Sequence, residues 1–576
     1  RVAGALIVPP NVTLRGVGVP AGPDQPGTVL AATGGRGNTA GPPLLSLTGA
    51  GASVRDLAVW YPEQGYRLGT VAPYPWTLRA THLAGIIDVT LYNSFLGLDL
   101  PHSSGTTVDR LRATCLLHCI RSDDNREYAF FTDVEISPRV WLEAGLPGRT
   151  EGPEPEAALR AITATYLTAV SFGRADGPTL YNVRVTDAAR DVVLSAATPG
   201  DSGFYGITSG VAARTEVEPG SINPHVGSFL ELDRVPGAVA GLGYTAAPER
   251  LAAQPLRLLD ARRPPWAVRG DAFTDDTAAL QAVLDAAGRS GGGIVYLPAG
   301  GYRIDGALHV PPGVELRGSY AVPHDAEVLD GTTLLAGGGR GASPGAPALV
   351  TLGAGAGLRG VKVVYPDQTA GAVAPYPATV RALGPGTWVV DVNIENGWEL
   401  VDLARVPADG FVVAGLWGTA LSTGVVVGAG TMGGWIERSV ITHGTWERSL
   451  RPNAPRPAAA EPLRRLTLAQ TRSFVIGDCR GLQSLGAHSF RAHTHLHAVG
   501  PEGRPCTDTL FVMTSADSAG GPGFRLDAGD RLRFAGVAAA SPAVPNTPFL
   551  LAGPGFAGTA EILGTLLWPD TIGRLP

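Results

Sequence analysis

The 576-residue sequence is almost free of lysine, since Lys362 is the only one and nearly all basic side chains are arginine. Charged residues make up only 17% of the chain, and the formal net charge is −6. A nucleic-acid partner requires a basic stripe, and none is present. No apolar run is long enough to cross a bilayer, which argues against membrane insertion. This charge balance favours a neutral ligand, although a local arginine cluster could still hold a uronate.

Cysteine is also scarce, with four residues at positions 115, 119, 479 and 506. Cys115 and Cys119 form a C-x3-C pair without a second pair or a histidine array, so we expect no zinc site. Disulfides and small buried thiols both remain open for these residues. No P-loop, Rossmann glycine motif or nucleophile elbow occurs in a strand-turn-helix context, and we therefore expect no cofactor.

Turn residues are abundant, with 78 glycines and 48 prolines, yet 44% of the chain is hydrophobic. Short runs of aliphatic residues alternate with polar ones and end at Gly, Asn or Asp. In residues 387–397, Val390, Val392 and Ile394 share one parity, and Asn396-Gly397 supplies a turn. Many short strands of this kind are typical of a solenoid, in which each coil buries its apolar face against the next.

An internal repeat organises the chain. ALIVPPNVTLRG at 5–16 returns as ALHVPPGVELRG at 307–318, and DVTLYNSFLGLDL at 88–100 returns as DVNIENGWELVDL at 391–403. The offset stays between 302 and 304 residues over nearly a hundred positions. We interpret the chain as a duplication and predict that the two copies overlay coil on coil. Leu14, Val89 and Leu91 should face the interior, as should their counterparts Leu316, Val392 and Ile394.

One helix is predicted near residues 274–288, with Thr274 as its N-cap, before the strand IVYLP. This stretch resembles the opening segment of the pectate-lyase superfamily of right-handed parallel β-helices, in which a short helix caps the solenoid. We therefore expect an all-β chain of two tandem right-handed parallel β-helices with a capping helix before the second. The first module should span 1–250, a linker 251–269 and the second module 270–576. We expect the chain to be truncated before Arg1, because the first copy lacks a cap.

Two such modules in tandem resemble glycoside hydrolase family 55, the exo-β-1,3-glucanase group. The resemblance implies a secreted glycoside hydrolase acting on a neutral polysaccharide or oligosaccharide, whose signal peptide is not in this chain. Two alternatives remain open. One is a polysaccharide lyase, and the other is a non-catalytic glycan-binding or tailspike-like protein. Oligomeric state is not predicted.

Glycoside hydrolysis needs two carboxyl groups, and acids beside sugar-stacking aromatic residues are the useful candidates. The first group lies in ENGWELVDL and comprises Glu395, Trp398, Glu399 and Asp402. Glu399 stands where the first copy has Leu96. A carboxylate at such a position either lies at the mouth of a coil or has a raised pKa. The alternative is a solvated acid on a turn.

The second group lies in GGWIERSVITHGTWERS and comprises Trp435, Glu437, His443, Trp446 and Glu447. Two indoles bracketing acids suit a sugar subsite, although Trp446 aligns with Trp141 and could be a packing residue shared by both copies. We predict Glu437 as a catalytic acid, because the first copy has Thr132 there. On this hypothesis Glu437→Gln lowers kcat by about two orders of magnitude or more.

The third group is a motif present in both copies, WYPEQ…PYPW and VYPDQ…PYPA. Its candidate sugar contacts are Tyr61, Glu63, Tyr74 and Trp76 in the first copy and Tyr365 and Asp367 in the second. Retention in both copies favours a structural role, with proline fixing the backbone and tyrosine packing on it.

Finally, His493, His495 and His497 alternate along one predicted strand, so their side chains should share a face. Such a row suits a metal, but no acidic ligand adjoins it, and we expect no metal site.

Overall fold

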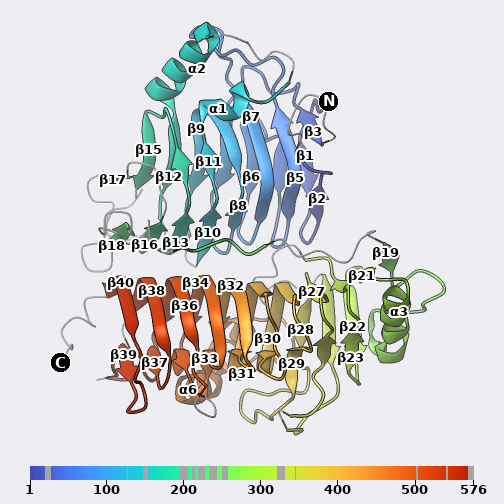
Figure 1. The fold of residues 1–576 in the computed structure, drawn as a ribbon. Helices are drawn as coiled ribbons and strands as arrows, with labels where there is room; N and C mark the ends of the chain where they lie inside the picture. Colours follow the sequence, from blue (N-terminus) through green and yellow to red (C-terminus); the bar gives the residue numbers. More distant parts are fainter. Residues whose placement is uncertain are drawn as a thin grey trace. The chain divides into compact units, whose positions relative to one another are not determined.

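The computed structural model describes residues 1–567 apart from residues 20–26, 126–127, 147–152, 175, 195–204, 210–214, 218–227, 232–242, 249–256, 321–330, 344, 501–503, 540–541 and 546. The chain divides into two compact units, Arg1–Val239 and Ala240–Pro576. Each unit is a right-handed parallel β-helix with its own parallel sheet system, and the ribbon in Figure 1 shows the stacked coils of each. The predicted linker 251–269 is described only from residue 257 onward.

The first unit contains eighteen strands and two helices among its described residues. The strands are β1 (Leu6–Val8), β2 (Thr13–Arg15), β3 (Val29–Ala31), β4 (Leu45–Leu47), β5 (Ser53–Trp60), β6 (Trp76–Ala80), β7 (Gly85–Leu100), β8 (Thr107–Asp109), β9 (Arg112–Ser122), β10 (Ala129–Thr132), β11 (Glu135–Ile136), β12 (Thr168–Phe172), β13 (Asp176–Tyr181), β14 (Arg184–Val185), β15 (Arg190–Leu194), β16 (Tyr205–Ser209), β17 (Thr215–Val217) and β18 (Ser228–Glu231). The helices are α1 (Pro138–Leu142) and α2 (Pro153–Tyr166).

The second unit contains twenty-two strands and four helices among its described residues. The strands are β19 (Leu258–Asp260), β20 (Asp271–Asp275), β21 (Gly293–Tyr296), β22 (Gly300–Ile304), β23 (Leu308–Val310), β24 (Val314–Arg317), β25 (Thr332–Ala336), β26 (Val350–Leu352), β27 (Gly357–Arg359), β28 (Lys362–Val364), β29 (Ala378–Ala382), β30 (Trp388–Leu403), β31 (Phe411–Val427), β32 (Thr431–Thr442), β33 (Arg472–Ile476), β34 (Cys479–Phe490), β35 (Thr494–Ala498), β36 (Thr507–Asp517), β37 (Phe524–Leu526), β38 (Asp530–Ala539), β39 (Leu550–Ala552) and β40 (Ala560–Leu567). The helices are α3 (Thr277–Arg289), α4 (Gly444–Glu447), α5 (Arg456–Ala459) and α6 (Glu461–Gln470).

Corresponding strands pair in the same register in the two units. In the first unit Val59 of β5 pairs with Leu91 of β7, and in the second unit Val363 of β28 pairs with Ile394 of β30. Both pairs are parallel, as expected when each strand lies one coil further along the solenoid. The shared register agrees with the duplication inferred from the sequence.

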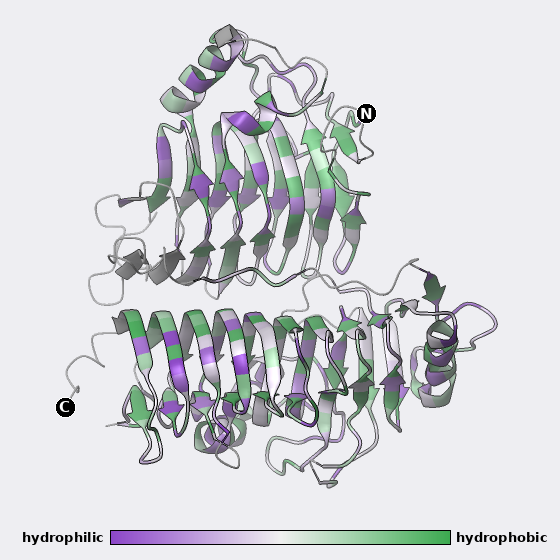
Figure 2. Cartoon of the chain, viewed as in Figure 1, coloured by the Kyte–Doolittle hydropathy of each residue, from purple (hydrophilic) through white to green (hydrophobic). Residues whose placement is uncertain are grey.

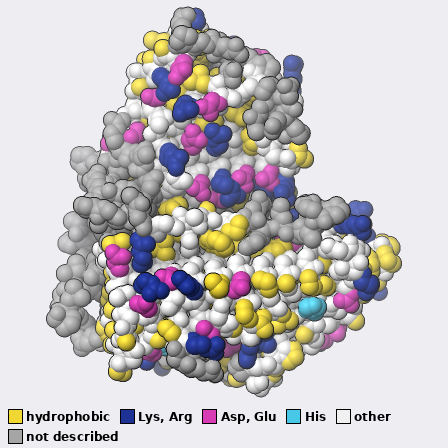
Figure 3. Space-filling view, viewed as in Figure 1, with side chains coloured by type: hydrophobic (Ala, Val, Ile, Leu, Met, Phe, Trp, Pro, Cys, Tyr) yellow, Lys and Arg dark blue, Asp and Glu magenta, His cyan; other side chains and the backbone are white. Residues whose placement is uncertain are grey.

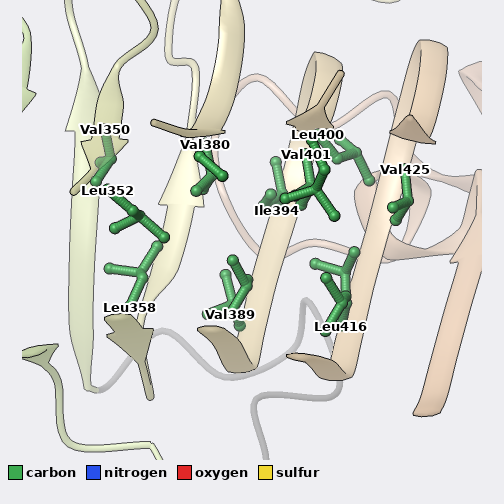
Figure 4. Packing of buried hydrophobic residues seen from close by; sticks show 14 of the residues in the cluster. Val350, Leu352, Leu358, Val380, Val389, Ile394, Leu400, Val401, Leu416 and Val425 are labelled. Carbon is green, nitrogen blue, oxygen red and sulfur yellow. The ribbon is translucent and has the colours of Figure 1, made fainter. Parts of the chain in front are cut away.

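The core of each unit is a column of aliphatic side chains stacked from coil to coil. Figure 4 shows Val350, Val380, Val401 and Val425 of successive coils pointing into the same interior space of the second unit. The predicted interior positions Val89, Leu91, Leu316, Val392 and Ile394 are fully buried, whereas Leu14 is partly buried and packs against the first core. The alternation was wrong for Val390, which lies in a separate cluster with Trp388 while Val389 faces the core, because Asp391 has a φ of +53° and interrupts the regular strand.

The predicted capping helix is α3, whose Leu280, Val283, Leu284 and Ala287 are buried in the second core. Its start differs from the prediction, since Thr274 belongs to strand β20 and the N-cap is Asp276. The carboxylate of Asp276 accepts hydrogen bonds from the backbone N–H groups of Arg269 (2.7 Å) and Gly270 (2.9 Å) instead of capping the helix. The carboxylate therefore ties the turn before β20 to the helix start.

The surfaces carry charges of both signs close together. In Figure 3 acidic and basic side chains lie side by side on the visible face of each unit. Figure 2 shows mostly hydrophobic strands interrupted by hydrophilic stretches, as the sequence alternation predicts. No helix in the described part of the chain is both long and apolar enough to span a membrane.

Candidate functional site

The motif shared by both copies builds a buried corner of the coil. In the first unit the Tyr61 hydroxyl lies 2.9 Å from Oγ1 of Thr77, and the rings of Tyr61 and Tyr74 are 4.7 Å apart. In the second unit the Tyr365 hydroxyl lies 2.8 Å from Oγ1 of Thr379. Tyr61, Tyr74 and Tyr365 are almost fully buried, so their side chains pack within the coil.

The same corner fixes the backbone of the strand that follows. Thr77 donates a hydrogen bond to the carbonyl oxygen of Leu96 (2.8 Å), and Thr379 donates to the carbonyl oxygen of Glu399 (3.1 Å). In the second unit the tyrosine–threonine pair therefore holds the backbone of the predicted acid at residue 399. The repeated motif therefore fixes the same backbone position in both copies, which is Leu96 in the first and Glu399 in the second.

The remaining candidates of the motif are divided between surface and core. Glu63 and Asp367 are exposed on turns. Trp76 is nearly buried. The centroid of its ring lies 5.5 Å from that of His118, and the guanidinium carbon of Arg121 lies 5.1 Å from the Trp76 ring centroid. None of these contacts gathers the motif into one accessible site.

Glu399 lies in β30, between Ala378 of the preceding coil and Thr423 of the next. Its side chain is partly exposed. Burial raises the pKa of Glu399 and the nearby Asp402 carboxylate raises it further, against the opposing influence of the arginines at positions 381, 405 and 472. A carboxyl group that keeps its proton to higher pH suits a general acid.

Asp402 is nearly buried and forms ion pairs with two arginines. Its Oδ2 lies 2.8 Å from Nε of Arg381 and 3.2 Å from Nε of Arg405. The first unit has the same pair, with Asp99 Oδ2 lying 2.6 Å from Nε of Arg79. The pair of residues 381 and 402 therefore belongs to the repeated scaffold, and Glu399 is the carboxyl group added beside it in the second copy.

Trp398 precedes this acid and is half-buried, packing against the main core and against the cluster of Leu421, Trp446, Ala454 and Leu463. Trp398, Glu399 and Asp402, which the sequence grouped together, all lie on strand β30. Sequence reasoning missed Arg381, Arg405 and Arg472, which surround Glu399 from other parts of the chain. Arg381 aligns with Arg79 in the repeat, which is the signal that could have revealed it.

Glu395 is fully buried, unlike an acid that must reach a substrate. Its carboxylate lies 3.8 Å from Nζ of Lys362 and 3.6 Å from Nε of Arg451. Lys362 is itself buried, and Arg451 also donates to Oγ1 of Thr333 (3.0 Å). The only lysine of the chain is thus used in an internal ion cluster.

Glu437 is nearly buried beneath residues 243–248, which belong to the same unit. Its Oε1 accepts hydrogen bonds from the Tyr244 hydroxyl and from the backbone N–H of Ala247 (2.7 Å), and its Oε2 lies 3.2 Å from Nη1 of Arg438. Trp435 donates from Nε1 to the carbonyl oxygen of Thr245 (2.9 Å). Glu437 and Trp435 therefore anchor this segment, which we call the strap.

Trp446 lies apart from this group, fully buried in the cluster with Leu421. His443 pairs with Glu447 through Nε2 at 3.1 Å, and Arg464 of α6 also pairs with Glu447. Burial lowers the pKa of His443 to about 4. These contacts hold the α4–α6 insertion against the coil.

A further acid with a raised pKa escaped the sequence reasoning. Burial raises the pKa of Asp517, which accepts a hydrogen bond from Oγ of Ser518 at 2.9 Å. Glu399 and Asp517 both have a clearly raised pKa. Glu399 alone has a neighbouring carboxylate contributing to that rise.

The histidines that were predicted to share one strand face have different surroundings. His495 is fully buried between the rings of Phe474 and Phe524 and hydrogen-bonds to Ser489 and Thr514. His497 faces Asp527, with Nε2 lying 2.8 Å from Oδ2. No group of three or more metal-ligating side chains occurs within the described part of the chain.

The four cysteines are buried free thiols in the structure. The Sγ atoms of Cys115 and Cys119 lie 2.8 Å apart inside the first unit. Burial raises the pKa of Cys506 to about 12, which disfavours a reactive thiolate there.

Comparison with known proteins finds one pectate-lyase-like segment near the start of the second unit. Residues 266–334 match the family model described as rhamnogalacturonase A/epimerase, pectate lyase-like. Mannuronan C5-epimerase AlgE3 of Azotobacter vinelandii is 45% identical over 71 residues, which is 11% of this chain and 4% of that protein. Alginate lyase 7 of the same organism is 41% identical over 73 residues, 12% of this chain and 8% of that protein. The matched segments thus span less than a tenth of these relatives.

Two solved structures are matched at low sequence identity. DFA-IIIase from Arthrobacter chlorophenolicus A6 is 12% identical, with a TM-score of 0.36, over 50% of this chain and 73% of that one. Iota-carrageenase complexed to iota-carrageenan fragments is 11% identical, with a TM-score of 0.28, over 52% of this chain and 56% of that one.

Proposed function

We propose that this chain is a glycoside hydrolase acting on a polysaccharide or oligosaccharide, with Glu399 as its general acid. The observation that carries the proposal is a partly exposed carboxyl group with a raised pKa, present in the second copy where the first has Leu96. A duplicated chain needs one active site, so a group present in only one copy is the better candidate. The family model match ends at residue 334, before this site.

In this proposal Glu399 donates its proton to the oxygen of the glycosidic bond as that bond breaks, while a water molecule adds its oxygen to the anomeric carbon and releases a proton. Burial raises the pKa of Glu399, and the negative charge of Asp402, which is paired with Arg381 and Arg405, raises that pKa further. Trp398 precedes the acid in the sequence, and its half-buried side chain packs against the cluster of Leu421 and Trp446. The Tyr365–Thr379 pair fixes the acid through its backbone.

Glu399→Gln tests the proposal directly, because it removes the proton donor and keeps the side-chain volume. We expect kcat on a cleaved glycan to fall by about a hundredfold or more, with an unchanged melting temperature. Glu461→Gln is the matched control, since Glu461 is an exposed acid of α6 paired with Arg465. Equal activity in the two variants would refute the assignment of Glu399 as the general acid. A parent protein that cleaves no glycan would refute the hydrolase proposal and favour a non-catalytic glycan-binding protein.

A polysaccharide lyase is the second candidate, and the arginines around Glu399 favour it. A lyase acting on a uronate needs a cation to neutralise the sugar carboxylate and a base to remove the adjacent proton. Arg405 is exposed and Arg472 is partly exposed, both within electrostatic reach of Glu399. Products separate the two activities, because hydrolysis yields a saturated reducing end and elimination yields an unsaturated sugar.

A further inference from the structure

A polar groove is lined by strands of the second unit that do not pair with the strand carrying Glu399. It has a volume of about 380 Å³, and its floor and walls come from β34, β36, β38 and β40, with Gly243 of the strap at one edge. Glu399, by contrast, pairs with residues of β29 and β31. Every described residue that lines the groove belongs to the second unit.

Four successive coils each contribute one strand position to this groove. Gln483 pairs with Leu510, Leu510 with Arg533, and Arg533 with Glu561. Neighbouring strands are about 4.8 Å apart, so these four positions span roughly 14 Å. That length accommodates more than one sugar ring, and the volume falls within the usual range for small-ligand sites.

The strap fixes one edge of the groove. Gln483 accepts a hydrogen bond from the backbone N–H of Thr245 (2.8 Å), and Glu437 holds Tyr244 and Ala247. Gly243 has a φ of +68°, and no atom lies within 4 Å of where its Cβ would be. The backbone at this edge therefore faces open space and can approach a ligand closely.

Charges in the groove cancel in pairs. Arg531 is bound to Asp508, with Nη2 lying 2.9 Å from Oδ2, and Nε of Arg533 lies 3.4 Å from Glu561. The side chains of Arg531 and Glu561 remain 55% and 57% exposed, so their outer donors and acceptors are accessible. Because each of these two guanidinium groups is paired with a carboxylate, the groove does not favour a polyanion. A neutral ligand rich in hydroxyl groups uses both donors and acceptors.

We propose that this groove is a separate binding site for a neutral oligosaccharide. Hydroxyl groups of the sugar bridge Arg533, Glu561 and Gln483, while Leu510 and Leu532 supply the apolar floor. The site holds a glycan chain on the second unit without taking part in bond cleavage at Glu399.

The test uses the full chain carrying Glu399→Gln, which suppresses turnover, and isothermal titration with laminari-, cello- and malto-oligosaccharides. Arg533→Ala combined with Glu561→Ala removes both members of one ion pair. We expect the affinity for the neutral oligosaccharide that binds to fall about tenfold or more, the usual effect of losing hydrogen bonds to charged groups. Glu461→Ala combined with Arg465→Ala removes a matched exposed pair on α6 and should leave the affinity within about twofold of the parent.

Three outcomes would overturn the proposal. One is equal affinity in the two double variants. Another is binding of oligogalacturonate, the anionic comparator, without binding of any neutral series. The third is binding to the wild-type chain that disappears with Glu399→Gln alone, which would place the glycan at Glu399. Arg533→Gln repeats the test with a smaller change if the double variant has a lowered melting temperature.

Discussion

The ion cluster around Glu395 yields a prediction that separates a structural role from a catalytic one. Lys362 is 0% exposed and its Nζ lies 3.8 Å from the Glu395 carboxylate. The first copy has Ala58 and Tyr92 at the two matching positions. Lys362→Ala therefore introduces a residue that the same coil geometry already accommodates, but it deprives Glu395 of one of its two cationic neighbours.

Breaking a buried ion pair on one side costs about 3–5 kcal/mol, because a charge is left in a poorly hydrated site. Arg451 still lies 3.6 Å from Glu395, so we expect the lower end, about 3 kcal/mol. For a unit the size of Ala240–Pro576 the unfolding entropy is about 0.7 kcal/mol/K. The melting temperature of the second unit should therefore fall by about 4 °C.

Differential scanning calorimetry measures the loss, with Arg465→Ala on the exposed face of α6 as the control. The double variant Lys362→Ala with Glu395→Tyr installs both residues of the first copy and removes both charges. It should recover most of the loss, since well-packed apolar replacements of buried ion pairs are often neutral. A Lys362→Ala protein that melts with the parent, or a double variant less stable than the single one, would refute this reasoning.

Three further predictions concern the site, the strap and the response to pH. Asp402→Asn removes a charge that raises the pKa of Glu399, so the alkaline limb of the kcat/KM profile should move to lower pH, and an unmoved limb would exclude Glu399 as the titrating acid. Glu437→Ala removes the acceptor for Tyr244 and Ala247, so amide hydrogen exchange in residues 243–248 should accelerate about tenfold, whereas unchanged exchange would show that other contacts hold the strap. Burial, followed by Arg121, lowers the pKa of His118 to about 4, so the folded state holds this ring neutral. The unfolded chain binds the extra proton below its ordinary value of about 6.5, so the stability of the first unit should be fully present above that pH and decline as pH falls towards 4. His118→Asn should flatten that decline in thermal melts recorded across the window.

The sequence predicted the architecture because the features that encode it are local or repeated. Alternation of period two identified Val89, Leu91, Val392 and Ile394 as interior residues, and each is fully buried. The offset of the repeat predicted matching coils, and the strands pair in matching register. The helix start was displaced because Asp271–Asp275 forms a strand, which the capping pattern alone did not reveal.

Sequence also brought Trp398, Glu399 and Asp402 together, since one strand carries all three. Only the tertiary structure decided how each acid is paired. Glu395 meets Lys362 and Arg451 from other coils, and Glu437 meets Tyr244 from 193 positions away. A carboxyl group's chemistry depends on its burial and on the charges within a few ångströms. In a solenoid those neighbours come from adjacent coils and insertions, so residue order specifies the scaffold while stacking determines which acid is buried, paired or accessible.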